Sequence, residues 1–343
     1  MSESSGAGSP SKRPTIHDVA RLAEVSHQTV SRYLRRNGGL KPGTEQRIAA
    51  AVAQLDYRPN LLARSMRTRR SGRLAVHIPA IAYNPARMLS GAASVAHDAG
   101  YVVDVLSFEG GVEARTERLL EIADSGQVEG LLSFAPLGED VRQRLSRTIA
   151  ITVAAEFDDE MRGIGGIADA SPIAEIIERL AALGHRRFLH VAGAPEFASA
   201  RARERVYRET IASLGLESLG VAPGDWTGAS GAAAVDAIAE DDRPTAIIAA
   251  NDEVATGVIR AATARGWRLP DELTVTGWGD APYTPFLTPS LTSVGIDVER
   301  VGSNAMRRLL RDLGAPAGAP DEAPLAQVVW RESSGPPPAR RDG

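Results

Sequence analysis

The stretch that decides the fold of this chain is Val25-Ser26-His27-Gln28-Thr29-Val30-Ser31-Arg32. We expect a helix that begins after Ser26. Because Val30 and Leu34 are four residues apart, they form one apolar stripe along that helix. The other face then carries four polar side chains, those of His27, Gln28, Ser31 and Arg32. Such groups can contact base edges in the major groove of DNA, where Arg suits guanine and Gln suits adenine.

The residues on both sides of this helix predict a helix-turn-helix. Upstream, Thr15 is placed to cap a first helix with Asp18 in its first turn, and Ser26 can cap the second. Apolar residues recur at helical spacing in the first helix, at Ile16, Val19, Ala20 and Ala23. Downstream, Pro42 suits the first turn of a third helix. The core face of that third helix consists of Ile48, Val52 and Leu55.

The charge distribution favours DNA binding over the alternative of three small helices that merely pack together. Between Lys12 and Arg73 there are 14 Lys and Arg residues against four Asp and Glu, a net charge of +10. The whole chain has a formal net charge of −4, so the remainder carries −14. A basic segment on an acidic protein marks the part that would contact a polyphosphate.

Three motifs resemble the head-piece of the lactose/galactose repressor (LacI) family: Thr15-Ile16-His17-Asp18-Val19-Ala20, Val25 to Arg32, and Leu55-Asp56-Tyr57-Arg58-Pro59-Asn60. The resemblance implies a dimeric transcription factor with a core that senses a small molecule. It also implies a set of DNA-contacting residues, namely Thr15, His27, Gln28, Thr29, Ser31, Arg32, Tyr57, Asn60, Ala63 and Met66.

Length and composition predict two or three domains and a soluble, cytoplasmic protein. The chain has 343 residues, 43% of them hydrophobic, and no cysteine, which excludes disulfides and thiolate metal sites. Residues 1–13 lack the apolar core of a signal peptide and are expected to form a disordered tail before a DNA-binding domain at 14–60. No apolar run is long enough for a membrane span, and no cofactor or metal is expected.

Residues 61–72 form a short, basic linker that resembles the hinge helix of the family. A helix of this length is marginal alone, so we expect it to form only with DNA and a partner subunit. By the resemblance, Met66 takes the position of an apolar wedge in the minor groove. The alternative is a basic linker that contacts phosphates only.

The remaining chain, 73–333, is predicted to form a two-lobed α/β core. Apolar strand-like runs alternate with helical ones, and this alternation specifies parallel sheets covered on both faces. Ligands bind such folds at the carboxyl ends of strands, here between the lobes. The runs are Leu74–Ile78, Pro85–Ala99, Tyr101–Phe108, Val112–Ser125, Val128–Phe134, Arg187–Ala192, Ser199–Leu214, Thr245–Ala250, Asp252–Arg265 and Leu273–Thr276.

The core also resembles the family, whose fold is similar to periplasmic binding proteins. The resemblance rests on the motifs Leu183 to Arg187, Ser199 to Arg203, Ala250 to Glu253 and Leu287 to Thr292. It implies three crossings between the lobes, with lobe 1 at about 73–167 plus 298–326 and lobe 2 at about 168–297 plus 327–333. We expect residues 334–343 to be a disordered tail. This end of the chain has no leucine heptads, so a coiled-coil tetramer is not indicated.

Three residues suit an effector site, by their chemistry and by the resemblance. Arg203 offers five donors for vicinal hydroxyls, Asn251 offers a donor and an acceptor, and Trp226 could stack on a pyranose as in galactoside-responsive members. Each has an alternative: a surface ion pair, a helix cap and a core residue, respectively. The family commonly has an Asp at the position of Gly279, and we assign Asp280, the next residue, to the effector set.

A second departure from the family is at Asn84-Pro85-Ala86, where a Phe is usual after the proline. The residues therefore favour a galactoside as effector without specifying it. We find no nucleophile elbow, zinc-protease or phosphate-loop motif, and no enzyme is expected. His185 and His190 flank a strand and are expected to pack or cap.

Together these features predict a repressor of carbohydrate-utilisation genes. It would be a homodimer on double-stranded operator DNA, released by a small carbohydrate, with no membrane partner. The same fold could instead activate transcription or respond to a non-sugar effector. A sugar-binding protein of another class would need a signal peptide and would not need residues 14–60. A sugar-converting enzyme would need an acid/base pair that the sequence does not contain.

Overall fold

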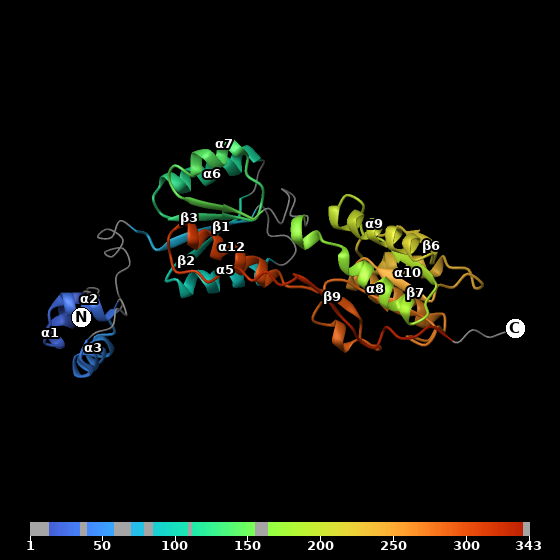
Figure 1. The fold of residues 1–343 in the computed structure, drawn as a ribbon. Helices are drawn as coiled ribbons and strands as arrows, with labels where there is room; N and C mark the ends of the chain where they lie inside the picture. The colour runs from blue at the N-terminus through green and yellow to red at the C-terminus, as the bar shows by residue number, and fades with distance from the viewer. Residues whose placement is uncertain are drawn as a thin grey trace, which may run out of the picture. The chain divides into compact units, whose positions relative to one another are not determined.

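The computed structural model describes residues 14–34, 40–57, 70–78, 85–108, 112–154 and 164–338. The chain divides into two compact units, Met1–Ser71 and Gly72–Gly343 (Figure 1). The predicted amino-terminal tail and most of the hinge segment, including Ala63 and Met66, lie outside the described residues.

Three short helices make up the amino-terminal unit: α1 (Ile16–Leu22), α2 (His27–Leu34) and α3 (Pro42–Gln54). Their predicted starts are confirmed. The Asp18 carboxylate accepts from the Thr15 N–H at 2.9 Å and from its hydroxyl at 2.7 Å. The Ser26 hydroxyl accepts from the Thr29 N–H at 3.2 Å, and Pro42 begins α3. These bonds satisfy donors that a helix start leaves free.

The predicted apolar stripes of the three helices meet in one small core. Its buried members are Val19, Ala20, Ala23, Val30, Ile48, Ala51 and Tyr57. One prediction was wrong: Ser31, expected on the exposed polar face of α2, is only 6% exposed. Because α2 packs against both α1 and α3, its buried face is wider than the stripe of Val30 and Leu34 indicated. A hydroxyl is small enough to be enclosed there.

The first lobe of the larger unit contains a four-stranded parallel sheet of order β2-β1-β3-β4. Its strands are β1 (Arg73–His77), β2 (Val102–Leu106), β3 (Gly130–Ser133) and β4 (Ala150–Val153). Helices α5 (Ala86–Asp98) and α12 (Val298–Asp312) cover one face, and α6 (Val112–Asp124) and α7 (Glu139–Leu145) the other (Figure 1).

Helices α5 and α12 approach closely because each has a glycine at the crossing. A Cβ on Gly91 would lie 2.0 Å from the Glu299 carbonyl oxygen, and one on Gly302 would lie 1.9 Å from that of Met88. Any side chain at either position would push the helices apart. This contact attaches a helix from the carboxyl-terminal part of the chain to the first lobe.

The second lobe repeats the arrangement with the order β6-β5-β7-β8, again parallel. Its strands are β5 (Arg187–Val191), β6 (Glu217–Ala222), β7 (Ala246–Ala249) and β8 (Thr274–Thr276). Helices α8 (Ser171–Ala182) and α9 (Ala198–Ser213) lie on one face. Helices α10 (Gly228–Asp236) and α11 (Asp252–Ala264) lie on the other.

Short elements complete the described part of the larger unit. Two 3-10 turns are η1 (Gly165–Ala168) and η2 (Thr284–Phe286). Strand β9 (Ser293–Ile296) precedes α12, and β10 (Ala326–Val329) follows it and pairs antiparallel with β9. No helix in the described ranges is long and apolar enough to cross a membrane.

The prediction of a disordered tail from residue 334 was wrong for its first residues. Gly335 accepts a hydrogen bond at its carbonyl from His185 Nε2 at 2.8 Å, and its N–H donates to Thr274 Oγ1 at 3.1 Å. Ser334 also bonds to Thr292 at 2.8 Å. These bonds hold Ser334 and Gly335 on the second lobe. Residues 339–343 lie outside the described ranges.

Candidate DNA-contacting helix and effector site

Helix α2 presents a polar surface on the amino-terminal unit. His27, Gln28 and Arg32 are exposed there, and Thr29 is partly exposed with its hydroxyl 2.9 Å from that of Ser26. The His27 ring also lies 5.2 Å from that of His17, between centroids. An exposed Gln and Arg one turn apart can both reach base edges from a helix in the major groove.

The other residues of the predicted DNA-contacting set have different surroundings. Thr15 is exposed at the start of α1, where it forms the cap. Tyr57 packs in the core of the unit, and burial raises the pKa of its hydroxyl. Ser31 is buried, as described above. Asn60, Ala63 and Met66 lie outside the described residues.

Arg203 is the central residue of the candidate effector site in the second lobe. Helix α9 carries it on the side that packs against the sheet, and it is 7% exposed. Its Nη1 donates to the Ala250 carbonyl at the end of β7, at 2.7 Å. The guanidinium carbon lies over two indole rings, 4.1 Å from the centroid of Trp278 and 5.6 Å from that of Trp226. Sequence reasoning missed Trp278 as a neighbour.

No ion pair satisfies this guanidinium within the described part of the chain. Burial lowers the pKa of Arg203 to about 9, and the field of Asp252 acts in the opposite direction. The residue is therefore still protonated at neutral pH. The alternative that Arg203 forms a surface ion pair was wrong, because α9 directs it inward.

Trp226 and Asn251 lie together beside Arg203. The Asn251 Nδ2 donates to the Trp226 carbonyl at 3.0 Å, and its Oδ1 accepts from the Val254 N–H at 2.7 Å. Asn251 therefore caps α11, which was the alternative to a ligand role. Trp226 has a φ of 72° and its ring lies against Gly193, where a Cβ would be 2.4 Å away. The indole is partly buried, and Phe197 meets it edge-on at 5.4 Å.

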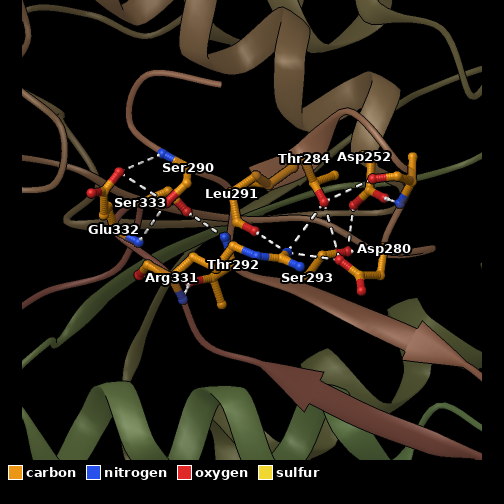
Figure 2. A network of polar contacts seen from close by, with 11 residues as sticks. Asp252, Asp280, Thr284, Ser290, Leu291, Thr292, Ser293, Arg331, Glu332 and Ser333 are labelled. Carbon is orange, nitrogen blue, oxygen red and sulfur yellow. Dashed lines mark hydrogen bonds and ion pairs between the residues drawn. The ribbon is translucent and has the colours of Figure 1, made fainter. Parts of the chain in front are cut away.

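The carboxylate of Asp280, the fourth predicted effector residue, is engaged elsewhere. It pairs with Arg331 at 2.7 Å and accepts from the Thr284 hydroxyl at 3.0 Å (Figure 2). Gly279, which precedes it, has a φ of 125°, a conformation that favours glycine. A Cβ there would lie 3.3 Å from the Asp252 carboxylate. The glycine at this family position is thus compatible with a backbone that an Asp would strain.

Asp252 is a buried carboxylate that sequence reasoning did not single out. It accepts from the Ser293 hydroxyl at 2.5 Å and from the Ala281 N–H at 2.8 Å, beside the Asp280–Arg331 pair (Figure 2). Burial raises its pKa, and these hydrogen bonds oppose that rise. The sequence signal that could have identified Asp252 is its position directly after Asn251, just past the end of β7. It joins the start of α11 to the loop after β8 and to β9.

The two histidines around β5 pack, as predicted. His185 contacts Thr245 at 3.0 Å and Gly335, and burial lowers its pKa. His190 Nδ1 lies 2.8 Å from the Ile248 carbonyl, its ring stacks on Tyr207, and burial lowers its pKa to about 4. Among the described residues, no group of three or more His, Asp or Glu side chains could hold a metal ion.

Comparisons with known proteins cover both units. Residues 15–60 match the family described as bacterial regulatory proteins, lacI family, and residues 177–334 match the periplasmic binding protein-like domain. The catabolite control protein A of Priestia megaterium is 30% identical, over 87% of this chain and 92% of that protein. The lactose operon repressor of Escherichia coli (strain K12) is 30% identical, over 88% and 85% respectively.

Solved structures agree with this assignment. The crystal structure of the lac repressor dimer bound to operator and the anti-inducer ONPF superposes with a TM-score of 0.64 at 25% identity, over 94% of this chain and 99% of that one. A helix-turn-helix followed by a periplasmic-binding-protein-like core defines a DNA-binding transcriptional regulator. The chain belongs to the LacI family of bacterial regulatory proteins.

Proposed function

We propose that this protein is a homodimeric repressor of carbohydrate-utilisation genes that a small carbohydrate releases from its operator. The proposal assigns it no catalytic reaction, and its target, chromosomal DNA, is in the cytoplasm. The observation that carries the proposal is the combination, in one chain, of an exposed polar face on α2 with a buried guanidinium in the second lobe that forms no ion pair with the described residues.

The proposed DNA contacts are of two kinds. His27, Gln28 and Arg32 contact base edges, and the basic surface around them contacts phosphates. Met66 from each of two hinge segments enters the minor groove. Two-fold symmetry of a dimer would match a palindromic operator with half-sites spaced by whole helical turns.

The proposed effector contacts come from Arg203, Trp226 and Asn251, which lie within one region of the second lobe. Arg203 supplies donors, Asn251 supplies its remaining N–H, and Trp226 supplies an apolar face. Asp280 then orients the loop after β8 through Arg331 instead of contacting the effector. The effector changes operator affinity only to the extent that its own affinity differs between the DNA-competent and DNA-incompetent states of the protein. DNA binding lowers effector affinity by the same factor.

The test is binding of the purified full chain to its own promoter region, followed by a panel of galactosides, glucosides, their acids and phosphates, and nucleobases. We expect salt-dependent binding whose log–log slope is roughly −0.9 per phosphate contacted. At least one sugar should release the DNA by roughly 5- to 150-fold, the usual range of such coupling. Arg203→Ala should respond to no sugar while binding the operator like the wild type. A repressor role is contradicted if no promoter fragment is bound, and the sugar role if only nucleobases act.

A further inference from the structure

The site around Arg203 is rich in hydrogen-bond donors. A guanidinium offers five N–H donors, and Arg203 uses its Nη1 for the Ala250 carbonyl, the one hydrogen bond it makes to the described residues. The indole Nε1 groups of Trp226 and Trp278, the two rings beside it, are buried and have no acceptor within those same residues. The site thus groups unused donors around one full positive charge.

The polar acceptors on the neighbouring loops are already engaged. Asn251 Oδ1 accepts the Val254 N–H at 2.7 Å as a helix cap. Asp252 accepts from Ser293 and Ala281, and Asp280 from Arg331 and Thr284. Asp225, next to Trp226, accepts from the hydroxyl of Thr227 at 2.6 Å and its N–H at 3.1 Å. Figure 2 shows how Asp252 and Asp280 take part in a network centred on Arg331.

Gly279 contributes to this shortage of acceptors, because it has no side chain. A carboxylate on that residue could have accepted from hydroxyls of a neutral sugar and offset the charge of Arg203. The φ of 125° strains any side chain at this position, and its Cβ would lie 3.3 Å from the Asp252 carboxylate. Two aromatic faces offset part of the cost of a buried cation, but a hydrogen-bonded anion offsets much more. Carboxylate and phosphate both match the fork of a guanidinium in two-point contact.

We propose that the effector is an anionic polyol, a sugar acid or a sugar phosphate, whose oxyanion pairs with Arg203 between the indoles of Trp226 and Trp278. This inference rests on the proposed function and names the class of its ligand. The carboxylate or phosphate supplies the acceptors that the site lacks. The polyol part contacts the remaining N–H of Asn251 and the face of Trp226.

The test uses tryptophan fluorescence of the full chain without DNA, since two of its four tryptophans lie at the site. The probes are D-galactose, D-galacturonate and D-galactose 6-phosphate, the matching three forms of D-glucose, and inorganic phosphate. At least one anionic probe should bind roughly 10- to 100-fold more tightly than its neutral parent, the usual worth of hydrogen bonds to a charged group. Whether the acid or the phosphate gains more identifies the source of the oxyanion.

Arg203→Gln should remove this preference for the anion. Arg203→Lys, which keeps the charge but loses the two-point fork, should keep the preference with weaker binding. The matched control is Arg205→Gln on the same helix, where an exposed guanidinium pairs with Glu209 at 2.9 Å, and it should behave like the wild type. Circular dichroism of each variant checks that it is folded.

Two results would overturn the inference. One is a neutral sugar that binds as tightly as its acid and its phosphate. The other is the absence of any Arg203-dependent response to an anionic probe. A mobility-shift assay with promoter DNA, run in parallel, separates this outcome from failure of the proposed function. Loss of DNA binding would contradict the repressor role while the fluorescence titration still reports the ligand class.

Discussion

The ion pair between Asp280 and Arg331 should stabilise the second lobe measurably. Its atoms are 2.7 Å apart, and the two side chains are only 27% and 16% exposed. Arg331 also donates to the Leu291 carbonyl at 2.8 Å and to the Thr284 hydroxyl at 3.2 Å. The pair therefore joins the segment after β10 to the loop after β8 (Figure 2). We expect its removal to destabilise the larger unit.

The expected magnitude follows from its partial burial. Breaking a buried pair costs about 3–5 kcal/mol, whereas an exposed pair contributes about 0.2–1 kcal/mol. This pair lies between those limits, so Arg331→Met should lower the free energy of unfolding by roughly 2–3 kcal/mol. Asp280→Asn preserves the shape and tolerates the residue's φ of 47°. The coupling energy from the double variant should be about 1–2 kcal/mol.

The assay is urea unfolding of the full chain followed by tryptophan fluorescence. All four tryptophans lie in the Gly72–Gly343 unit, so the signal reports that unit alone. The control is a cycle on the exposed pair of Arg268 and Glu272, 3.0 Å apart, for which we expect about 0.5 kcal/mol or less. A coupling energy for Asp280 and Arg331 no larger than this control would refute the reasoning.

Three further predictions concern both units. Gln28→Ala should cost about 1–3 kcal/mol of operator affinity and relax preference at one base pair, measured by competition with mutated operators; unchanged selectivity would show that α2 does not contact bases. Burial lowers the pKa of His190 to about 4, so between pH 6.5 and 4 only the unfolded chain binds a proton at this residue. As the pH falls through this window, His190 should therefore lower the free energy of unfolding by about 1.4 kcal/mol per pH unit. His190→Leu should flatten that dependence in urea titrations at several pH values, and a profile identical to the wild type would exclude the histidine as its source. Gly279→Ala should cost about 1–3 kcal/mol of unfolding free energy because of its φ of 125°, whereas Gly318→Ala, whose Cβ would meet only Arg307 Nε at 3.8 Å, should change little; equal effects of the two would contradict the backbone argument.

Local sequence signals were reliable where the interactions they depend on are local. The capping residues Thr15 and Ser26, the position of Pro42 and the stripe of Val19 and Val30 all lie as predicted. Helix caps and i, i+4 stripes involve residues a few positions apart, so the sequence contains both partners. The alternation of strands and helices also predicted parallel sheets, because a crossover helix after each strand returns the chain to the same end of the sheet.

The sequence by itself determined a helix-turn-helix, an α/β core and the effector-site candidates Arg203, Trp226 and Asn251. Only the tertiary structure decided which of their groups are free. It enclosed Ser31, ordered Gly335 against His185, and placed Arg203 beside Trp226 and Trp278 with no ion pair to the part of the chain that the structure describes. It also engaged Asp280 with Arg331, 51 positions away in the chain. Burial and charge pairing depend on residues distant in sequence, and a local pattern contains only one of the two partners.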